Sequence, residues 1–110
     1  MSENRNSVDG KRITNPSAGD LTRQEPGDFA WEFDFTHFEH GAREMDEIQI
    51  LYICLPGNEQ WAPIRVKRGE SPGDRIWGWD GNLDKPTIKP SIWEKGIWHG
   101  HMIAGRLISA

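Results

Sequence analysis

The chain has 110 residues, of which 35% are hydrophobic, and a formal net charge of −4 at pH 7. This length favours a single domain and excludes separate cofactor and substrate domains. Acidic and basic residues are interspersed, which argues against duplex nucleic acid as a partner because duplex-binding proteins normally carry a basic stripe. A single cysteine, Cys54, excludes an intrachain disulfide. Since no apolar run is long enough for a signal peptide or a membrane span, we expect a cytoplasmic protein without a membrane partner.

The N-terminal quarter of the chain differs in composition from the rest. Residues 1–27 contain few apolar side chains among many polar and charged ones. Such a segment buries too little surface to offset the entropy lost on ordering. We therefore expect a disordered arm over residues 1–27, the alternative being a segment that folds over a neighbouring subunit, and one β-rich domain over residues 28–110.

The first strands of this domain are predicted from apolar patterns. Aromatic residues alternate with other residues from Phe29 to Phe35, which is the period of a half-buried strand. Residues 48–55 form a nearly continuous apolar run, typical of a central strand covered on both faces. A shorter strand is expected over residues 61–67, where Pro63 places its start at an edge or a bulge.

The C-terminal half is predicted to continue as short strands. Residues 68–74 have the composition of a loop, and residues 76–79 form a strand that a turn follows. The proline-containing stretch 86–93 is expected to be extended but peripheral, because proline cannot donate to a strand ladder. Residues 96–109 have the pattern of a hairpin. The expected fold class is mainly β, a small antiparallel sandwich or barrel.

The four histidines come in two close pairs, His37 with His40 and His99 with His101. Residues i and i+2 of a strand point to the same face, so His99 and His101 should project side by side. Isoleucines on that predicted face place it against the core or a pocket. Two such imidazoles are a common half of a zinc or iron site, which the other pair would complete. The alternative is a set of ordinary, partly exposed histidines.

Tryptophans dominate the second half of the chain. Trp77 and Trp79 share one face of their predicted strand, and with Trp98 they would form a platform on which nucleobases, sugars or a partner's side chains stack. The alternative is core packing, with each indole N–H finding a partner. Polar residues near these rings in sequence complete the candidate ligand site: Asn82, Lys85, Thr87, Lys89, Ser91, His99 and His101.

The sequence predicts no catalytic residue. By spacing, Ser91 and Thr87 have no base partner, and Cys54 lies in an apolar run, where a thiol is usually inert. Asp80 and Asp84 flank a turn that they are expected to cap. A protein that binds rather than catalyses is therefore favoured.

The stretch Trp77 to Ile92 resembles a motif of small phage and prophage proteins of unknown function, some of them labelled ammonia-monooxygenase-like. Their motif is W-x-W-(D/N)-G-x-x-x-x-P-T-(L/I/F)-x-P-S-(I/V), and the resemblance covers residues 48–109. Where these proteins carry a cysteine-rich knuckle, this chain keeps only Cys54. The resemblance implies a phage or mobile-element setting, and a zinc site of that family would match Cys54, His99 and His101.

These features lead to the hypothesis of a phage accessory binding protein, for instance one that counters a host defence. It would hold a nucleotide-like small ligand or a host protein on the aromatic platform, as a homo-oligomer in the host cytoplasm, and it would need no cofactor. Two alternatives remain open. One is a small metal-dependent enzyme that uses the four histidines to bind zinc. The other is a virion-associated structural protein whose residues 1–27 order on assembly.

Overall fold

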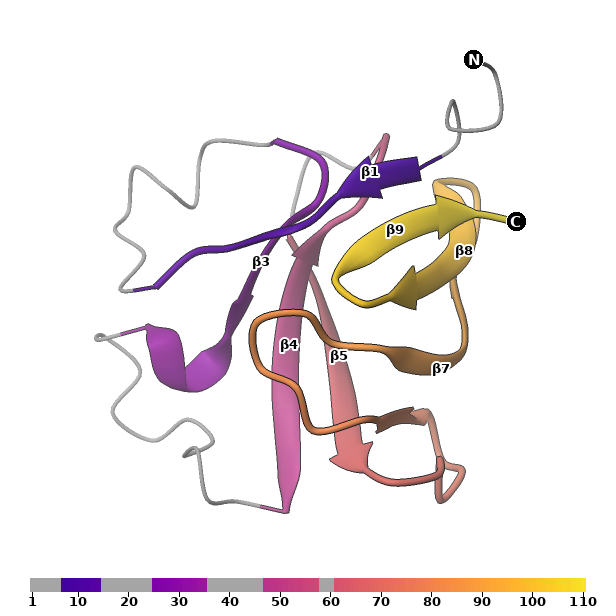
Figure 1. The fold of residues 1–110 in the computed structure, drawn as a ribbon. Coiled ribbons are helices and arrows are strands. Elements are labelled where there is room, and N and C mark those ends of the chain that lie inside the picture. Colours follow the sequence, from indigo (N-terminus) through magenta and orange to yellow (C-terminus); the bar gives the residue numbers. More distant parts are fainter. Residues whose placement is uncertain (1–6, 15–24, 36–46, 58–60) are drawn as a thin grey trace.

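The computed structural model describes residues 7–14, 25–35, 47–57 and 61–110. Within these ranges the chain forms short strands and one 3₁₀ helix, η2 (Figure 1). In chain order they are β1 (Ser7–Asp9), β2 (Lys11–Arg12), β3 (Asp28–Trp31), η2 (Glu32–Asp34), β4 (Ile48–Cys54), β5 (Trp61–Arg68), β6 (Ile76–Trp79), β7 (Ile88–Glu94), β8 (Trp98–Ile103) and β9 (Arg106–Ser109). No helix within the described ranges has the length and apolar character needed to cross a membrane.

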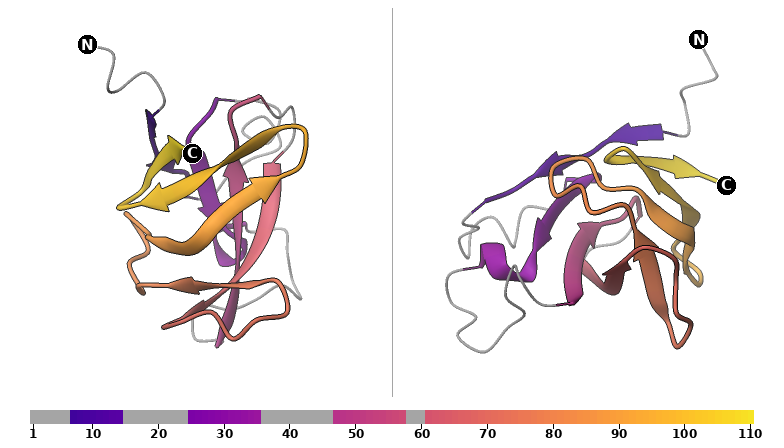
Figure 2. Two further views of the ribbon diagram at one scale, coloured as in Figure 1. Left: turned by 90° about the vertical axis from the view of Figure 1, so that its right-hand side faces the viewer. Right: turned by 60° about the horizontal axis from the view of Figure 1, so that its bottom comes forward.

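The described strands form one nine-stranded sheet in the order β1-β9-β8-β7-β6-β5-β4-β3-β2. Most neighbours are antiparallel, but β2 pairs with β3 and β5 pairs with β6 in parallel. The sheet curves strongly, as the two turned views show (Figure 2). The predicted fold class, mainly β, is confirmed, and the sheet has the form of a nearly closed barrel.

The N-terminal segment closes this barrel. Strand β1 pairs with β9 at one end of the sheet, and β2 pairs with β3 at the other, although only Gly10 separates β1 from β2 (Figure 1). The backbone of Gly10 passes so close to Gly105 that a Cβ atom there would overlap the Gly105 carbonyl oxygen. Residues 7–12 of the predicted arm therefore belong to the sheet, whereas residues 1–6 and 15–24 of the arm lie outside the described residues.

Strand β3 is shorter than the alternation of aromatic residues predicts. It ends at Trp31, and η2 takes the place of the expected continuation to Phe35. The cause is Asp34, whose carboxylate accepts the backbone N–H of Trp31 at 3.0 Å and is paired with the Arg12 guanidinium at 2.8 Å. This hydrogen bond turns the chain, and the strand prediction beyond Trp31 is wrong.

Strands β4 and β5 provide one wall of the core. Leu51 and Ile53 of β4 and Val66 of β5 are fully buried on the inner face. The outer face of β4, which was also predicted to be covered, is covered only in part: Ile48 is 39% exposed, Ile50 and Tyr52 are half-buried, and Cys54 is fully buried. The edge expected at Pro63 is confirmed locally, because β6 begins to pair with β5 only two residues later.

The other wall consists of β6 to β9. Strand β7 was expected to be peripheral, but it lies inside the sheet between β6 and β8. Pro90 is accommodated because pairing with β8 is interrupted between Ile88 and Ile92. The predicted C-terminal hairpin is confirmed as β8 and β9, joined by Ala104 and Gly105, which both have positive φ.

Candidate active site

The interruption in β7 is a bulge that carries Ser91. Three residues of β7, residues 89–91, lie between the paired residues Ile88 and Ile92, whereas the matching interval of β8 holds only His101. A bulge bends a strand and changes where its side chains point, and bulges are common beside active sites. Because Ile88 and Ile92 point into the core, Ser91 lies half-buried toward the outer face.

His99 reaches Ser91 from the neighbouring strand. Residues of β8 alternate between buried and exposed, which places His99 on the outer face. Its Nε2 atom lies 3.0 Å from the Oγ atom of Ser91, within hydrogen-bond distance. When the hydrogen of a neutral imidazole is on Nδ1, Nε2 accepts the hydroxyl proton, which is how a histidine activates a serine. The prediction that Ser91 has no base partner is therefore wrong.

Two tryptophans hold this serine–histidine pair in place. The indole N–H of Trp77 donates to the backbone carbonyl oxygen of Ser91 at 3.1 Å. On the other side, Trp93 lies opposite His99 in the ladder, with the two ring centroids 5.8 Å apart. Among the described residues, no carboxylate forms an ion pair or hydrogen bond with His99, so this part of the chain provides a dyad.

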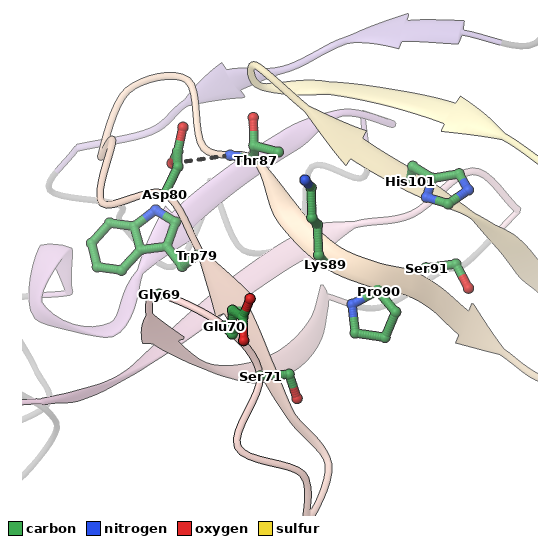
Figure 3. A pocket seen from close by; sticks show the side chains of 11 residues that line it. Gly69, Glu70, Ser71, Trp79, Asp80, Thr87, Lys89, Pro90, Ser91 and His101 are labelled. Atoms are coloured by element: carbon green, nitrogen blue, oxygen red, sulfur yellow. Dashed lines mark hydrogen bonds between the residues drawn. The ribbon is translucent and has the colours of Figure 1, made fainter.

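A cleft of about 970 Å³ begins at Ser91 (Figure 3). Ser91 and His101 lie at one end of it. The loop after β5 forms one side through Gly69, Glu70 and Ser71. The volume lies at the upper end of the range typical of small-molecule sites.

The cleft extends from the serine toward the end of β6. Along the cleft, Pro90 and Lys89 of β7 lie next to Ser91. Trp79 and Asp80 lie at the far end, with Thr87 beside them (Figure 3). The carboxylate of Asp80 accepts the Thr87 N–H at 3.2 Å, which ties the end of β6 to the start of β7. The predicted role of Asp80 in capping the turn is also confirmed, since its carboxylate accepts the backbone N–H of Asn82 at 3.0 Å.

The three tryptophans of the predicted platform do not form an open stacking surface. Trp79 and Trp98 are only 6% and 9% exposed, and Trp77 is partly buried against the core. Each indole N–H has a partner, Asn82 O for Trp79 and Ser109 Oγ for Trp98. Core packing, the alternative reading, therefore describes these three rings. Among the described tryptophans the exposed ring is that of Trp93, which is not part of the predicted platform.

The polar residues of the predicted ligand site are divided between two places. Thr87, Lys89, Ser91 and His101 line the cleft, and His99 bonds to Ser91. The other two lie in the turn that precedes β7: the Asn82 side chain accepts the backbone N–H of Lys85 at 2.9 Å. Asn82 therefore shapes the turn, and Lys85 lies within it.

The predicted metal site is only partly within the described residues. His99 and His101 do share one face of β8, but this face is not turned toward the core: Ile103 on it is 47% exposed, and of the two histidines only His101 lines the cleft. His37 and His40 lie outside the described residues. Among those described, no three His, Cys, Asp or Glu side chains are close enough together to hold a metal ion. A zinc site that uses the four histidines stays a prediction.

Cys54 is fully buried, and this burial, together with the charges of Asp28 and Glu25, raises the pKa of its thiol. At mildly alkaline pH the folded chain therefore holds less thiolate than the unfolded chain, and the thiolate is the form that reacts with alkylating reagents. We expect iodoacetamide to modify Cys54 slowly in the native protein and quickly in concentrated urea, as measured by intact mass. Equal rates in the two states would contradict the burial of this side chain.

The described part of the chain is thus a barrel-like β domain with a serine–histidine dyad on its outer face, next to a cleft. Residues 25–110 match the model of the family BubE, described as bacterial ubiquitination-like system serine protease. Because the match spans well over half of the chain, the chain belongs to the BubE family. None of the curated proteins and none of the solved structures matches it. The resemblance to phage proteins stays a prediction.

Proposed function

We propose that the chain is a serine protease of a bacterial ubiquitination-like system, in which Ser91 is the nucleophile and His99 the general base. One observation carries the proposal, namely the 3.0 Å contact between Ser91 Oγ and His99 Nε2. The description of the BubE family supports the reaction class and the setting. The position of Ser91 at the mouth of the cleft supports the role of a residue that meets substrate.

The proposed reaction has two steps. Ser91 Oγ bonds to the scissile carbonyl carbon while His99 Nε2 takes the hydroxyl proton, and His99 then gives this proton to the departing amide nitrogen as the C–N bond breaks. In the second step His99 takes a proton from water, whose oxygen attacks the acyl carbon. The bond to Oγ breaks, the proton returns to Ser91, and a carboxylic acid leaves.

The indole of Trp77 has a defined part in this scheme. Its hydrogen bond to the Ser91 carbonyl oxygen fixes the backbone of the bulge, where Ser91 is not held by regular pairing with β8. A nucleophile held in place within tenths of an ångström reacts faster, because less motion must be frozen on the way to the transition state. Trp77 is thus a positioning residue for Ser91.

The test uses reagents that need no knowledge of the protein substrate. A fluorophosphonate phosphonylates only an activated serine, so we expect it to label one residue, which peptide mapping identifies as Ser91. With p-nitrophenyl acetate we expect a burst of p-nitrophenol equal in amount to the enzyme, since acylation precedes slower hydrolysis. Absence of both signals, or a label on another serine, would overturn the proposal.

The binding function predicted from the sequence stays a prediction. The described residues hold no observation that favours a nucleotide-like ligand or a host protein over the reaction proposed above. Oligomeric state, the cytoplasmic location and the virion-associated alternative likewise remain predictions.

A further inference from the structure

The cleft reaches Ser91, whereas His99 lies outside the cleft lining. Ser91 lines the cleft, but neither His99 nor Trp93 does. The His99 ring contacts Ser91 through Nε2. Trp93 is paired with His99 in the ladder between β7 and β8, and its ring lies close to the His99 ring. Two surfaces therefore meet at the Ser91 hydroxyl: the cleft, and the part of the outer sheet face that carries His99 and Trp93.

The chemistry of acyl transfer assigns a different half of the substrate to each surface. The imidazole that takes the proton from Ser91 must hand it to the leaving nitrogen, so the leaving half of the substrate must lie on the side of His99. The acyl half stays bonded to Oγ and must extend away from that side. The cleft, which begins at Ser91 and runs toward Trp79, has the position that the acyl half requires.

Trp93 is the residue that the leaving half would meet. Its side chain is 67% exposed, more than any other large apolar side chain of the described residues, whereas tryptophan is highly buried on average. Exposed tryptophans next to a site commonly contribute a large part of the binding energy when a partner covers them. A substrate nitrogen within reach of His99 brings the next side chain of the substrate over this ring.

We infer that the substrate binds with its acyl half in the cleft and its leaving half across Trp93, which selects an apolar residue directly after the scissile bond. The inference rests on the proposed function and adds the direction of the chain and one specificity-determining residue. Within the outer face, Ile103 is a matched reference. Like Trp93 it is exposed and apolar, but it belongs to β8 and lies beyond His101, on the side away from Trp93.

Acetyl transfer from p-nitrophenyl acetate tests the leaving side alone. Ser91 Oγ takes the acetyl group and p-nitrophenolate departs. An added amino acid amide then attacks the acetyl carbon, giving an N-acetyl amide and free Ser91, in competition with water. This step is the reverse of acylation by a peptide, so the amine occupies the leaving side. The ratio of two N-acetyl products, measured by mass spectrometry, is independent of how fast the acyl-enzyme forms.

We expect the enzyme to prefer phenylalaninamide over glycinamide by about tenfold, the factor that partial burial of one aromatic side chain provides. Trp93→Ala should bring this ratio close to one, whereas Trp93→Phe should keep most of it. Ile103→Ala should leave the ratio unchanged. If Trp93→Ala does not fold, the comparison of Trp93→Phe and Trp93→Leu provides the same test, because only the former keeps a ring.

The acyl side is tested by comparing p-nitrophenyl octanoate with p-nitrophenyl acetate, which share a leaving group. Glu70 is exposed and lines the cleft, so Glu70→Trp should narrow it and slow acylation by octanoate relative to acetate. The same variant should not change the preference between the two amides. Trp93→Ala should change the preference between the two amides and leave the ratio of octanoate to acetate acylation unchanged.

The outcomes separate the inference from the function on which it rests. If no burst and no acetyl transfer occur, the proposed function fails, and the inference with it. If the burst occurs but Trp93→Ala keeps the preference for phenylalaninamide, only the inference is overturned. If Trp93→Ala changed the acyl-length preference and Glu70→Trp changed the amide preference, the substrate would bind in the opposite direction, with its leaving half in the cleft.

Discussion

Replacing Ser91 with alanine is expected to remove the p-nitrophenol burst and the fluorophosphonate label, and to lower ester turnover by at least about 10³-fold. Alanine has no oxygen to form the acyl-enzyme, so only direct attack of water on the ester remains. His99→Gln is expected to lower the acylation rate by about 10² to 10⁴-fold, the usual contribution of a general base, because an amide cannot take up the proton. Stopped-flow measurement of p-nitrophenol release checks both.

The matched control is His101→Gln. His101 also lies on the exposed face of β8 and lines the cleft, but no hydrogen bond joins it to Ser91. We expect a loss of less than about tenfold, since a general base must be within hydrogen-bond reach of the proton it removes. Circular dichroism and the thermal midpoint should match the wild type in all three variants. Equal losses for His99→Gln and His101→Gln would contradict the assignment of the base.

Gly10→Ala is expected to destabilise the fold by about 2 kcal/mol or more, the usual cost of forcing an extra methyl group into a packed site. The added Cβ would overlap the carbonyl oxygen of Gly105 and approach that of Gly27 at 3.2 Å. Both are backbone atoms, which cannot rotate away as a flexible side chain can. For a domain of this size the thermal midpoint should fall by roughly 10 °C. Calorimetry or urea unfolding measures the change.

Asp9→Ala provides the control in the same segment. Asp9 is exposed and pairs with Arg106 at 2.9 Å, and exposed ion pairs contribute about 0 to 1 kcal/mol. We therefore expect a much smaller shift in the unfolding midpoint. If Gly10→Ala were as mild as Asp9→Ala, the close approach of β1 and β2 to the C-terminal hairpin would be wrong.

The strands could largely be predicted from local patterns, and their order could not. The apolar run that became β4 and the Gly-containing turn between β8 and β9 both carry their signal within a few residues. The end of β3 depends instead on Asp34, which is held by Arg12 from 22 positions away. The closure of the barrel at Gly10 depends on Gly105 in the same way. Contacts of that kind leave no periodic trace in the sequence.

The site shows the same division. That His99 and His101 share a face followed from the period of a strand and is confirmed. That His99 rather than His101 reaches Ser91 depends on the register between β7 and β8, and this register shifts at residues 89–91. The exposure of Trp93 could have been predicted from the sequence. If the apolar Ile92 points into the core, the alternation of side chains along a strand turns Trp93 outward.

The bulge in β7 has a further consequence for how such a site can arise. It adds two residues to one strand, and two is the period of a strand, so Ile88 and Ile92 point inward just as they would in a regular ladder. An insertion of this length at this point changes the surface and leaves the packing of the interior untouched. The bulge can therefore place the Ser91 hydroxyl beside His99 while the inward-facing residues on either side of it keep their places in the core.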